Sequence, residues 1–478
     1  MSYENPNIGG KTLNEVYAQI MSRAPEHDIN PSLDAMKKIA HIMADPQKSF
    51  RTIHITGTNG KGSTARMTEA ICREYGLRTG LYASPHLESV TERIVIDGQP
   101  ISDDYFVDIY DQTIDFINLV DEQSVAEGKP RMSFFEVLTV MAMWAFADSA
   151  IDVAIIEVGM GGLWDATNVF DADAAIIGPI DMDHMQWLGG SVEQIAKEKA
   201  GIIKKNSSVV IAPQPHEEAV MPIVRDYADK TGAKNIICDG IESEVISRVP
   251  AVGGQVVTLR TPSGVYEDVP ISMFGQQQAH NALAALCAAE IVLPVSSALN
   301  GDIVAQALSS VKIPGRVEIV RTSPTIILDG GHNINAVSAL RETLEENFDF
   351  SELVGVTSMM SDKNVEDVLS VLEPVIDTLV VTQNSYPQRA MPPEELEKIA
   401  ISVFGPDRVI RRDFFPDALQ AAVDCVDSGD ETGVGYGRGI LVFGSFVTAG
   451  DARALLKSKT NEILSLPKEQ RVSKEEQV

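Results

Sequence analysis

The chain is poor in positive charge. It carries 39 Lys and Arg residues against 68 Asp and Glu residues, a formal net charge of −29 at pH 7 over 478 residues. Binding to a nucleic-acid backbone or to an anionic membrane needs clustered basic side chains, so this balance argues against both partners. Binding of a small anion at a local site remains compatible with it.

Long apolar runs and paired cysteines are also missing. The longest strongly apolar stretch, Val137–Ala147, is too short to span a bilayer, and the start, Met1–Asn5, lacks the apolar core of a signal peptide. We therefore expect a cytoplasmic protein without a membrane span. The cysteines lack the spacing of zinc sites or disulfide frameworks, which predicts free thiols. They are Cys72, Cys238, Cys287 and Cys425.

The order of the predicted elements indicates parallel sheets. Apolar, β-rich runs alternate with helical stretches, which is typical of a parallel sheet covered by helices. The segment 248–273 instead predicts antiparallel hairpins. The predicted strands are 51–56, 79–83, 152–158, 174–178 and 207–212, then 325–329, 353–357, 377–382 and 439–444.

The length and the punctuation of the chain predict two domains. One hydrophobic core rarely supports 478 residues. A boundary is predicted at Ile313-Pro314-Gly315-Arg316, where a helical run ends and a new strand-helix series begins. We expect a first α/β domain over 1–312 with an N-terminal extension, a second over 313–466, and a flexible charged tail over 467–478.

A glycine-rich loop is the most informative motif. Thr56-Gly57-Thr58-Asn59-Gly60-Lys61-Gly62-Ser63-Thr64 lies between an apolar run and a helical run. Glycines let backbone N–H groups approach phosphate oxygens, the next helix points its positive end at them, and Lys61 adds a charge. The loop predicts a site for ATP or a similar anion. The alternative is a plain glycine turn between strand and helix.

The loop departs from the common P-loop in two positions. Ile55 stands five residues before the Gly-Lys pair, where a glycine is usual, and Gly62 follows Lys61 in place of a magnesium-binding hydroxyl. We therefore interpret it as a shorter variant. Its metal ligands must come largely from other segments.

Polar side chains follow two of the predicted strands. Glu157 ends the apolar strand 152–158, and Asp181-Met182-Asp183-His184 follows the strand 174–178. The carboxyl ends of parallel strands share one sheet edge, where carboxylates commonly hold magnesium, so Glu157 and His184 are candidate metal ligands. Alternatively, Glu157 pairs with a backbone group or an Arg, and His184 is an ordinary loop residue.

Lys199 is predicted to lie on the buried face of a helix. It shares a helical stripe with Val192, Ile195 and Ile202, after a predicted capping box of Ser191 and Gln194. An unpaired buried ammonium is costly, so the side chain needs an anion, a lowered pKa or chemical conversion. The alternative is a side chain that extends its charged end to water.

These motifs, in this order and spacing, resemble the dihydrofolate synthase/folylpolyglutamate synthase family of the Mur ligase superfamily over roughly residues 50 to 450. The first-half motifs are Gly57-Thr58-Asn59-Gly60-Lys61-Gly62-Ser63, Ser84-Pro85-His86-Leu87, Thr91-Glu92-Arg93-Ile94, Glu157-Val158-Gly159-Met160-Gly161-Gly162, Asp165-Ala166-Thr167-Asn168 and Glu198-Lys199-Ala200-Gly201-Ile202. The others are Gly275-Gln276-Gln277-Gln278-Ala279-His280-Asn281, Pro314-Gly315-Arg316, Asp329-Gly330-Gly331-His332-Asn333 and Phe443-Gly444-Ser445.

The resemblance implies an ATP-dependent acid–amino-acid ligase. Its fold would be a P-loop ATPase domain with a mainly parallel sheet, followed by a C-terminal Rossmann-like α/β domain. The expected activity is bifunctional: L-glutamate is added to dihydropteroate, giving dihydrofolate, and to folates, giving polyglutamates. The alternatives are a monofunctional folylpolyglutamate synthase and, from another class, a P-loop NTPase that acts as a conformational switch. We expect a monomer with small-molecule partners only.

The resemblance also implies roles for individual residues. In the ATP site it places Gly57, Thr58, Asn59, Gly60, Lys61, Gly62, Ser63, Asn281, Arg316 and Asp329. As ligands of two Mg²⁺ ions it implies Ser84, Glu157, His184 and Lys199, the last as a carbamate, and it allows for a monovalent cation. Catalytic roles fall to Lys61, Lys199, Asp329 and His332, and substrate-binding roles to His86, Arg93, Asp165 and Ser445.

The chain departs from the family pattern at three places. Leu163-Trp164 stands where Arg-Leu is frequent, so a substrate or phosphate contact is missing or replaced by aromatic stacking. Ile334 stands where proline is usual, which leaves the turn after Asn333 less constrained. Gln277 stands where histidine is usual, with little expected cost.

Overall fold

The computed structural model describes residues 10–25, 31–294, 297–428 and 437–464, so the predicted tail 467–478 lies outside the described residues. The described chain forms two compact units. The first combines Met1–Ser272 with Gln276–Val311, and the second combines Met273–Gly275 with Lys312–Val478. Within these ranges no helix has the length and apolar character needed to cross a bilayer.

The first unit is built on an eight-stranded sheet with the order β4-β3-β2-β5-β1-β6-β7-β8. Only β3 and β4 run antiparallel to their neighbours. In the centre, Ile55 of β1 lies opposite Glu157 of β5, and Thr56 lies opposite Ile177 of β6. The strands are β1 (Arg51–Thr56), β2 (Thr79–Tyr82), β3 (Ile94–Ile96), β4 (Gln99–Pro100), β5 (Val153–Glu157), β6 (Ala174–Ile177), β7 (Ser208–Ile211) and β8 (Asn235–Cys238).

Helices cover both faces of this sheet, so its apolar strands are buried on both sides. Every residue of β5 and β6 is buried, which explains their continuous apolar sequences. One core cluster includes Phe106, Phe146 and Phe170, and another includes Ile195 and Ile202. The helices are α1 (Leu13–Met21), α2 (Asp34–Ile42), α3 (Lys61–Glu74), α4 (Asp103–Ala126), α5 (Phe134–Asp148), α6 (Met185–Leu188), α7 (Val192–Ala200), α8 (Glu217–Thr231), α9 (Gln276–Val292) and α10 (Gly301–Ser310), with 3₁₀ turns at Pro46–Lys48, Val90–Arg93 and Ala166–Val169.

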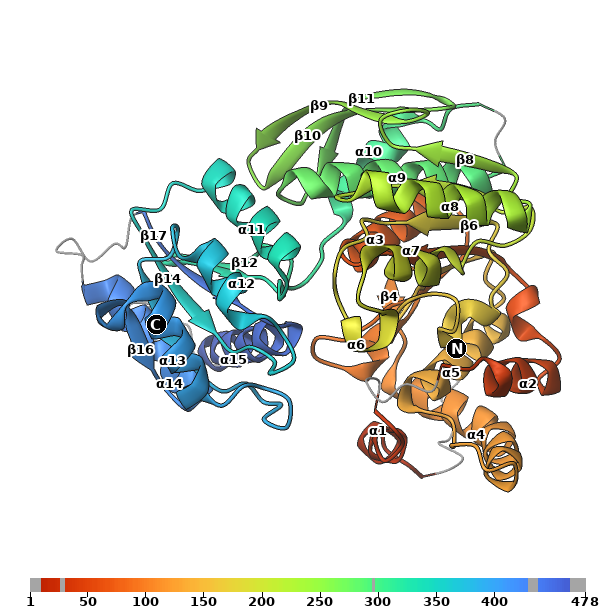
Figure 1. Ribbon diagram of the computed structural model, residues 1–478, viewed down its shortest axis with the longest axis horizontal. Coiled ribbons are helices and arrows are strands. Elements are labelled where there is room, and N and C mark those ends of the chain that lie inside the picture. The colour runs from red at the N-terminus through yellow and green to blue at the C-terminus, as the bar shows by residue number, and fades with distance from the viewer. Residues whose placement is uncertain (1–9, 26–30, 295–296, 429–436, 465–478) are drawn as a thin grey trace. The chain divides into compact units, whose positions relative to one another are not determined.

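The predicted hairpins form a separate three-stranded sheet. Antiparallel β9 (Glu244–Ala251), β10 (Gly254–Thr261) and β11 (Gly264–Ile271) lie against α9 and α10 (Figure 1). The first strand begins at Glu244, before the predicted start at 248. Its sequence gave no clear start because most of β9 is exposed and carries little apolar alternation.

The second unit contains a six-stranded sheet with the order β12-β13-β17-β14-β15-β16. Its four central pairings are parallel, and only β12 pairs antiparallel, with β13. The strands are β12 (Glu318–Thr322), β13 (Thr325–Leu328), β14 (Glu352–Thr357), β15 (Thr378–Val381), β16 (Val409–Arg411) and β17 (Arg438–Phe443). The helices are α11 (Ile334–Asn347), α12 (Val365–Leu372), α13 (Pro393–Phe404), α14 (Phe415–Ser428) and α15 (Phe446–Leu464), with a 3₁₀ turn at Pro406–Arg408.

The predicted fold class, two mainly parallel α/β sheets, is confirmed. All nine predicted parallel strands are present within one residue at each end. The missed strands, β3, β4, β8, β12 and β16, are short and lie at or near the sheet edges, where little apolar sequence is needed. The cysteines are free, as predicted.

Candidate active site

The glycine-rich loop joins the end of β1 to the start of α3. Gly57 has φ +154° and Gly60 has φ +82°, a backbone region that favours glycine. A Cβ atom at Gly60 would lie 2.7 Å from Oδ1 of Asn281, and one at Gly57 would lie 3.1 Å from Cα of Gly178. Both glycines are therefore required by backbone conformation and by close neighbours. The loop leads directly into the N-terminus of α3, the arrangement that suits a phosphate.

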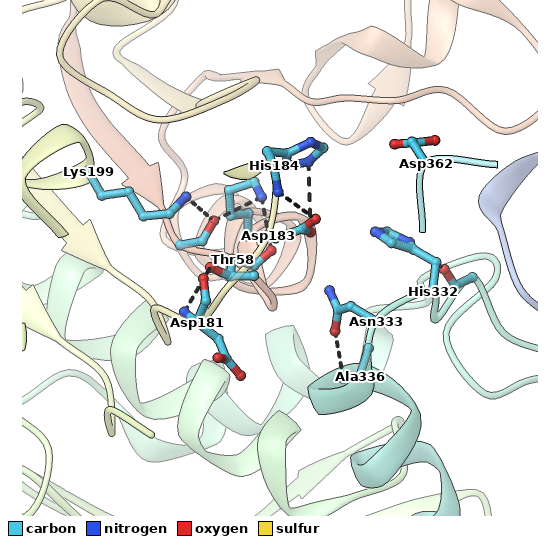
Figure 2. Close-up of polar contacts among 12 residues, drawn as sticks. Thr58, Asp181, Asp183, His184, Lys199, His332, Asn333, Ala336 and Asp362 are labelled. Carbon is cyan, nitrogen blue, oxygen red and sulfur yellow. Dashed lines mark hydrogen bonds and ion pairs between the residues drawn. The ribbon is translucent and has the colours of Figure 1, made fainter. Parts of the chain in front are cut away.

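Two lysines meet at one carbonyl of this loop. Lys61 Nζ donates to the carbonyl oxygens of Gly57 at 3.1 Å and Thr58 at 3.3 Å, and Lys199 Nζ donates to the same Gly57 oxygen at 2.8 Å. Figure 2 shows Lys199 extending toward the loop. Its predicted burial is confirmed, with 4% of the residue exposed. Burial, followed by the charge of Lys61, lowers the pKa of Lys199 to about 7.

The helix that carries Lys199 is capped slightly differently from the prediction. Ser191 accepts from the Gln194 backbone N–H, as expected for an N-cap. The Gln194 side chain, however, accepts from Gly190 N at 2.7 Å, so the reciprocal half of the predicted capping box is wrong. The reason is local: the turn at Gly189 and Gly190 brings the Gly190 N–H within reach of the Gln194 amide.

Thr58 connects the glycine-rich loop to the segment after β6. Its Oγ1 donates to the Asp181 carbonyl and accepts from the Asp181 N–H, both at 3.0 Å (Figure 2). The same segment continues to Asp183 and His184. His184 has φ +49°, and its Nε2 lies 3.8 Å from Oδ2 of Asp183. These two hydrogen bonds therefore hold Thr58 of the glycine-rich loop against Asp181, three residues before His184.

Glu157 and Ser84 lie together at the carboxyl ends of neighbouring strands β5 and β2. Glu157 Oε2 accepts from the Ser84 N–H at 3.1 Å, and the residue is 4% exposed. A Cβ at Gly62 would lie 3.5 Å from the same oxygen, so the carboxylate faces the first turn of α3. A buried carboxylate beside a phosphate-type loop suits a divalent cation.

The predicted metal ligands fit magnesium only in part as they stand. Within the described residues no three His, Cys, Asp or Glu side chains converge on one point. Glu157 and the Ser84 hydroxyl supply the oxygen atoms that Mg²⁺ prefers, whereas Lys199 is an amine that donates to Gly57. An oxygen ligand at position 199 requires chemical conversion of that amine.

Asp165 is almost entirely enclosed by its own loop, residues 159–168. Its carboxylate accepts from Met160 N at 2.9 Å, from Thr167 N at 3.0 Å and from the Thr167 hydroxyl. Burial raises its pKa, while the bonds to Thr167 and Met160 act in the opposite direction. Leu163, in the same loop, donates its N–H to the Glu198 carbonyl at 2.8 Å. The loop that presents Asp165 is therefore attached to the helix that presents Lys199.

His86 and Arg93 contact each other directly. Arg93 Nε donates to His86 Nδ1 at 2.8 Å, and its guanidinium lies 5.2 Å from the centre of the Phe134 ring. His86 Nε2 lies 3.5 Å from the Tyr17 hydroxyl of α1. Arg93 is 2% exposed, so its buried charge must be stabilised by contacts within the protein rather than by solvent.

Asn281 packs on the glycine-rich loop from α9. Its amide Nδ2 donates to Gln278 Oε1 at 3.1 Å, and its Oδ1 is the atom that would clash with a Cβ at Gly60. The residue is 6% exposed. This position places Asn281 beside the turn that precedes Lys61.

Within the second unit, Asp329 organises the segment after β13. Its carboxylate accepts from Val317 N at 3.0 Å and from Gly331 N at 2.7 Å. Burial raises the pKa of Asp329, and the Arg316 charge opposes that shift. The Arg316 guanidinium lies 4.4 Å from the centre of the Phe446 ring, and His332 Nδ1 lies 3.1 Å from the Gly330 carbonyl oxygen.

Ser445 lies in a buried hydroxyl cluster at the carboxyl ends of β14, β15 and β17. Its Oγ lies 2.7 Å from Oγ1 of Thr448 and accepts from Thr448 N at 3.0 Å. Thr448 Oγ1 donates to the Ser358 carbonyl at 2.8 Å, and Asn384 Nδ2 approaches Ser445 Oγ and Thr448 Oγ1 at 3.5 and 3.3 Å. Polar side chains at this edge of a parallel sheet are typical of a ligand site.

Two family models match the chain and divide it. The model described as Mur ligase middle domain matches residues 55–289, and the model described as Mur ligase, glutamate ligase domain matches residues 315–446. The dihydrofolate synthase/folylpolyglutamate synthase of Mycobacterium tuberculosis is 43% identical over 461 residues, covering 93% of this chain and 94% of that protein. The chain belongs to the dihydrofolate synthase/folylpolyglutamate synthase family. The predicted resemblance is confirmed.

Other relatives agree with this membership. The Bacillus subtilis dihydrofolate synthase/folylpolyglutamate synthase is 31% identical, over 76% of this chain and 83% of that protein. A structure of the M. tuberculosis folylpolyglutamate synthase with ADP has a TM-score of 0.88 at 43% identity, covering 93% of this chain and 98% of that one. E. coli FolC in complex with DHPP and ADP has a TM-score of 0.79 at 25% identity, covering 94% and 99%.

Several residues around the site were missed by the sequence analysis. His54 of β1 contacts Thr167 of the 159–168 loop, and Asn384 and Thr448 lie next to Ser445. The available signal was a histidine between Ile53 and Ile55 in an otherwise apolar strand. A polar residue at a buried strand position needs a partner, which sequence alone could not name.

Proposed function

We propose that this chain is an ATP-dependent ligase that joins L-glutamate to dihydropteroate, giving dihydrofolate, and to folates, giving polyglutamates. The observation that carries the proposal is 43% identity to a dihydrofolate synthase/folylpolyglutamate synthase over 93% of the chain. The glycine-rich loop with Lys61 supports it, because this chemistry begins with ATP.

The reaction requires activation of a carboxylate. A carboxylate is too poor an electrophile to react with an amine, so the γ-phosphoryl group of ATP is transferred to it, and the amine of glutamate then displaces phosphate from the acyl phosphate. Catalysis of such a transfer depends mainly on positioning and on electrostatic stabilisation. Lys61 and the backbone N–H groups of residues 57–63 would bind the phosphates, with Asn281, Arg316 and Asp329 completing the ATP site.

The remaining roles follow from the chemistry of each side chain. Ser84, Glu157 and His184 would hold Mg²⁺, which neutralises phosphate charge when bound. Asp165, His86 and Arg93 would bind the pterin-containing substrate, and Ser445 would bind glutamate. His332 and Asp329 would complete the catalytic groups. We further expect a cytoplasmic monomer.

A mass assay tests the proposed activity. Purified protein is incubated with ATP, magnesium, glutamate and either dihydropteroate or tetrahydrofolate. Products heavier by one or more glutamate residues are expected from both acceptors. Products from tetrahydrofolate alone would indicate a monofunctional folylpolyglutamate synthase, which the unusual Leu163-Trp164 pair allows for. ATP hydrolysis without any amide product would indicate a conformational switch.

Lys199 is the residue for which we propose a covalent change. Its neutral amine would add CO₂ and release a proton, forming a carbamate whose oxygen can ligate a metal. The lowered pKa of about 7 supports this, because only the neutral amine reacts. After this conversion, Lys61 would be the remaining ammonium group at the Gly57 carbonyl.

Substitution separates an anionic role from a cationic one. Lys199→Ala should lose ligation, with partial rescue by acetate, while exposed Lys197→Ala on the same helix serves as the control. A carbamate signal in ¹³C NMR with ¹³CO₂ should be present in the wild type and absent from Lys199→Ala. Full activity of Lys199→Arg would show that the role is cationic.

A further inference from the structure

His54 is a polar side chain buried at the centre of the first unit. It lies in β1 and is 0% exposed. Its Nε2 lies 2.8 Å from Thr167 Oγ1, whereas Nδ1 has no hydrogen-bond partner among the described residues. Burial lowers the pKa of His54 to about 3, with a further contribution from Lys204, so the ring is neutral near pH 7.

The hydrogen bonds run from His54 to Asp165. A neutral imidazole has one N–H, and placing it on Nε2 leaves a lone pair rather than a donor unsatisfied at Nδ1. Thr167 Oγ1 then accepts from His54 and donates its own proton to Asp165 Oδ1. The Thr167 backbone N–H donates to the same Oδ1 at 3.0 Å. The side chains of His54 and Thr167 thus form two consecutive hydrogen bonds that orient the Asp165 carboxylate.

The same face of β1 holds the 159–168 loop at a second point. Thr56, two residues after His54 and therefore on the same side of the strand, donates through Oγ1 to the Gly161 carbonyl at 2.7 Å. The strand then continues into the glycine-rich loop at Gly57. An apolar side chain at position 54 could fill the core without the cost of burying a ring nitrogen, so the contact with Thr167 is what the imidazole adds.

We propose that His54 and Thr167 are positioning residues for Asp165 and thereby set the affinity for the pterin-containing substrate. The proposal rests on the proposed function, in which Asp165 contacts that substrate. Loss of the hydrogen bonds that run from His54 through Thr167 lets the Asp165 carboxylate rotate or take up a proton within its loop. The glycine-rich loop keeps its own hydrogen bonds through Thr58, so the ATP site is unaffected.

Thr167→Val tests the hydrogen bonds between His54 and Asp165, because valine keeps the shape of threonine and has a methyl group in place of the hydroxyl. The matched control is Thr113→Val, which removes a buried hydroxyl that donates to Ile109 O at 2.8 Å within α4. Thr167→Val should raise both the KM and the equilibrium Kd for dihydropteroate by about tenfold, while the KM for ATP stays within about twofold. Thr167→Ser should restore the wild-type values, and Thr113→Val should leave all of them unchanged.

A double-mutant cycle tests whether His54 acts through Thr167. His54→Leu alone should weaken dihydropteroate binding, and adding it to Thr167→Val should weaken binding little further. Additive losses would overturn the proposal, as would Thr167→Val behaving like Thr113→Val or raising the KM for ATP equally. If Thr167→Val does not fold, Thr167→Ala is compared with Thr113→Ala. Wild-type protein that forms no amide product would refute the proposed function instead.

Discussion

At the scale of single residues, two lysine side chains of the site share one hydrogen-bond acceptor. Lys61 and Lys199 both donate to the Gly57 carbonyl, and the proximity of Lys61 contributes to the lowered pKa of Lys199. Two ammonium groups at one carbonyl repel each other. Binding of a phosphate to Lys61, or conversion of Lys199 to an anion, relieves that repulsion. The arrangement is therefore suited to an anionic ligand.

Lys61→Ala should abolish ligation without unfolding the protein. The side chain contributes a charge to the phosphate site and little to the core, so we expect glutamate incorporation to fall by about 10²-fold or more. Circular dichroism should be unchanged. Lys230→Ala, at an exposed position of α8, is the control and should keep full activity. Wild-type turnover in Lys61→Ala would contradict the assignment of the loop.

His54 should make the protein sensitive to acid. Its pKa is about 3 in the folded state against an ordinary value near 6.5, so below pH 6.5 the unfolded chain binds a proton that the folded one does not. Stability is therefore lost as the pH falls from 6.5 toward 3. Between pH 6.5 and 4.5 the wild type should lose on the order of 1–3 kcal/mol more than His54→Gln, which does not titrate. Urea unfolding at several pH values measures this, and parallel pH profiles would rule it out.

At the scale of elements, the 159–168 loop and the end of α7 pack backbone against backbone. A Cβ at Gly162 would lie 2.7 Å from the Glu198 carbonyl oxygen and 2.9 Å from that of Lys199, and one at Gly201 would lie 2.5 Å from Leu163 Cα. Asn168 closes the junction by donating to the Gly201 carbonyl at 3.1 Å. The position of Lys199 thus depends on residues of another element that have no reactive group.

Gly162→Ala should separate these two elements. The new methyl group meets two carbonyl oxygens that cannot rotate away, so we expect a loss of about 2–3 kcal/mol in the free energy of unfolding, and ligation should fall with it. Gly190→Ala is the matched control because a Cβ there meets nothing within 4 Å. Denaturant unfolding and glutamate incorporation are measured on both. Equal stability of the two variants would show that the junction tolerates a side chain.

At the scale of the whole molecule, the two units do not follow a single cut in the sequence. Met273–Gly275 belongs to the second unit, although residues on both sides of it belong to the first. Phe274 explains this assignment: its ring centre lies 5.3 Å from that of Phe348, which stacks on Phe350 at 5.5 Å. A short segment from within the sequence range of the first unit thus contributes to the core of the second unit.

Phe274→Ala should destabilise the second unit. Removal of a partly buried ring from this aromatic group should cost about 1–3 kcal/mol of that unit's unfolding free energy. Phe414→Ala, whose side chain is largely exposed in the second unit, is the control. Hydrogen exchange followed by mass spectrometry should show faster exchange in β14 and α11 for Phe274→Ala only. Unchanged exchange there would contradict the packing role of Phe274.

The sequence by itself determined the features that depend on local pattern. The parallel strands were predictable because strands buried on both faces need continuous apolar runs, and the glycine-rich loop because its conformation and close approach require glycine. Burial of Lys199 was predictable because the side chain shares a helical stripe with Ile195 and Ile202. These signals lie within a few residues of each other along the chain.

Only the tertiary structure decided which distant groups meet. Lys199 and Gly57 are separated by 142 residues, and His54 and Thr167 by 113. Phe274 lies before α9 in sequence but packs with the second unit. A buried polar or aromatic group announces that it needs a partner, but the partner is selected by how sheets and helices pack, which no local pattern encodes. The residues with chemistry were therefore visible in the sequence, whereas the groups that position them were not.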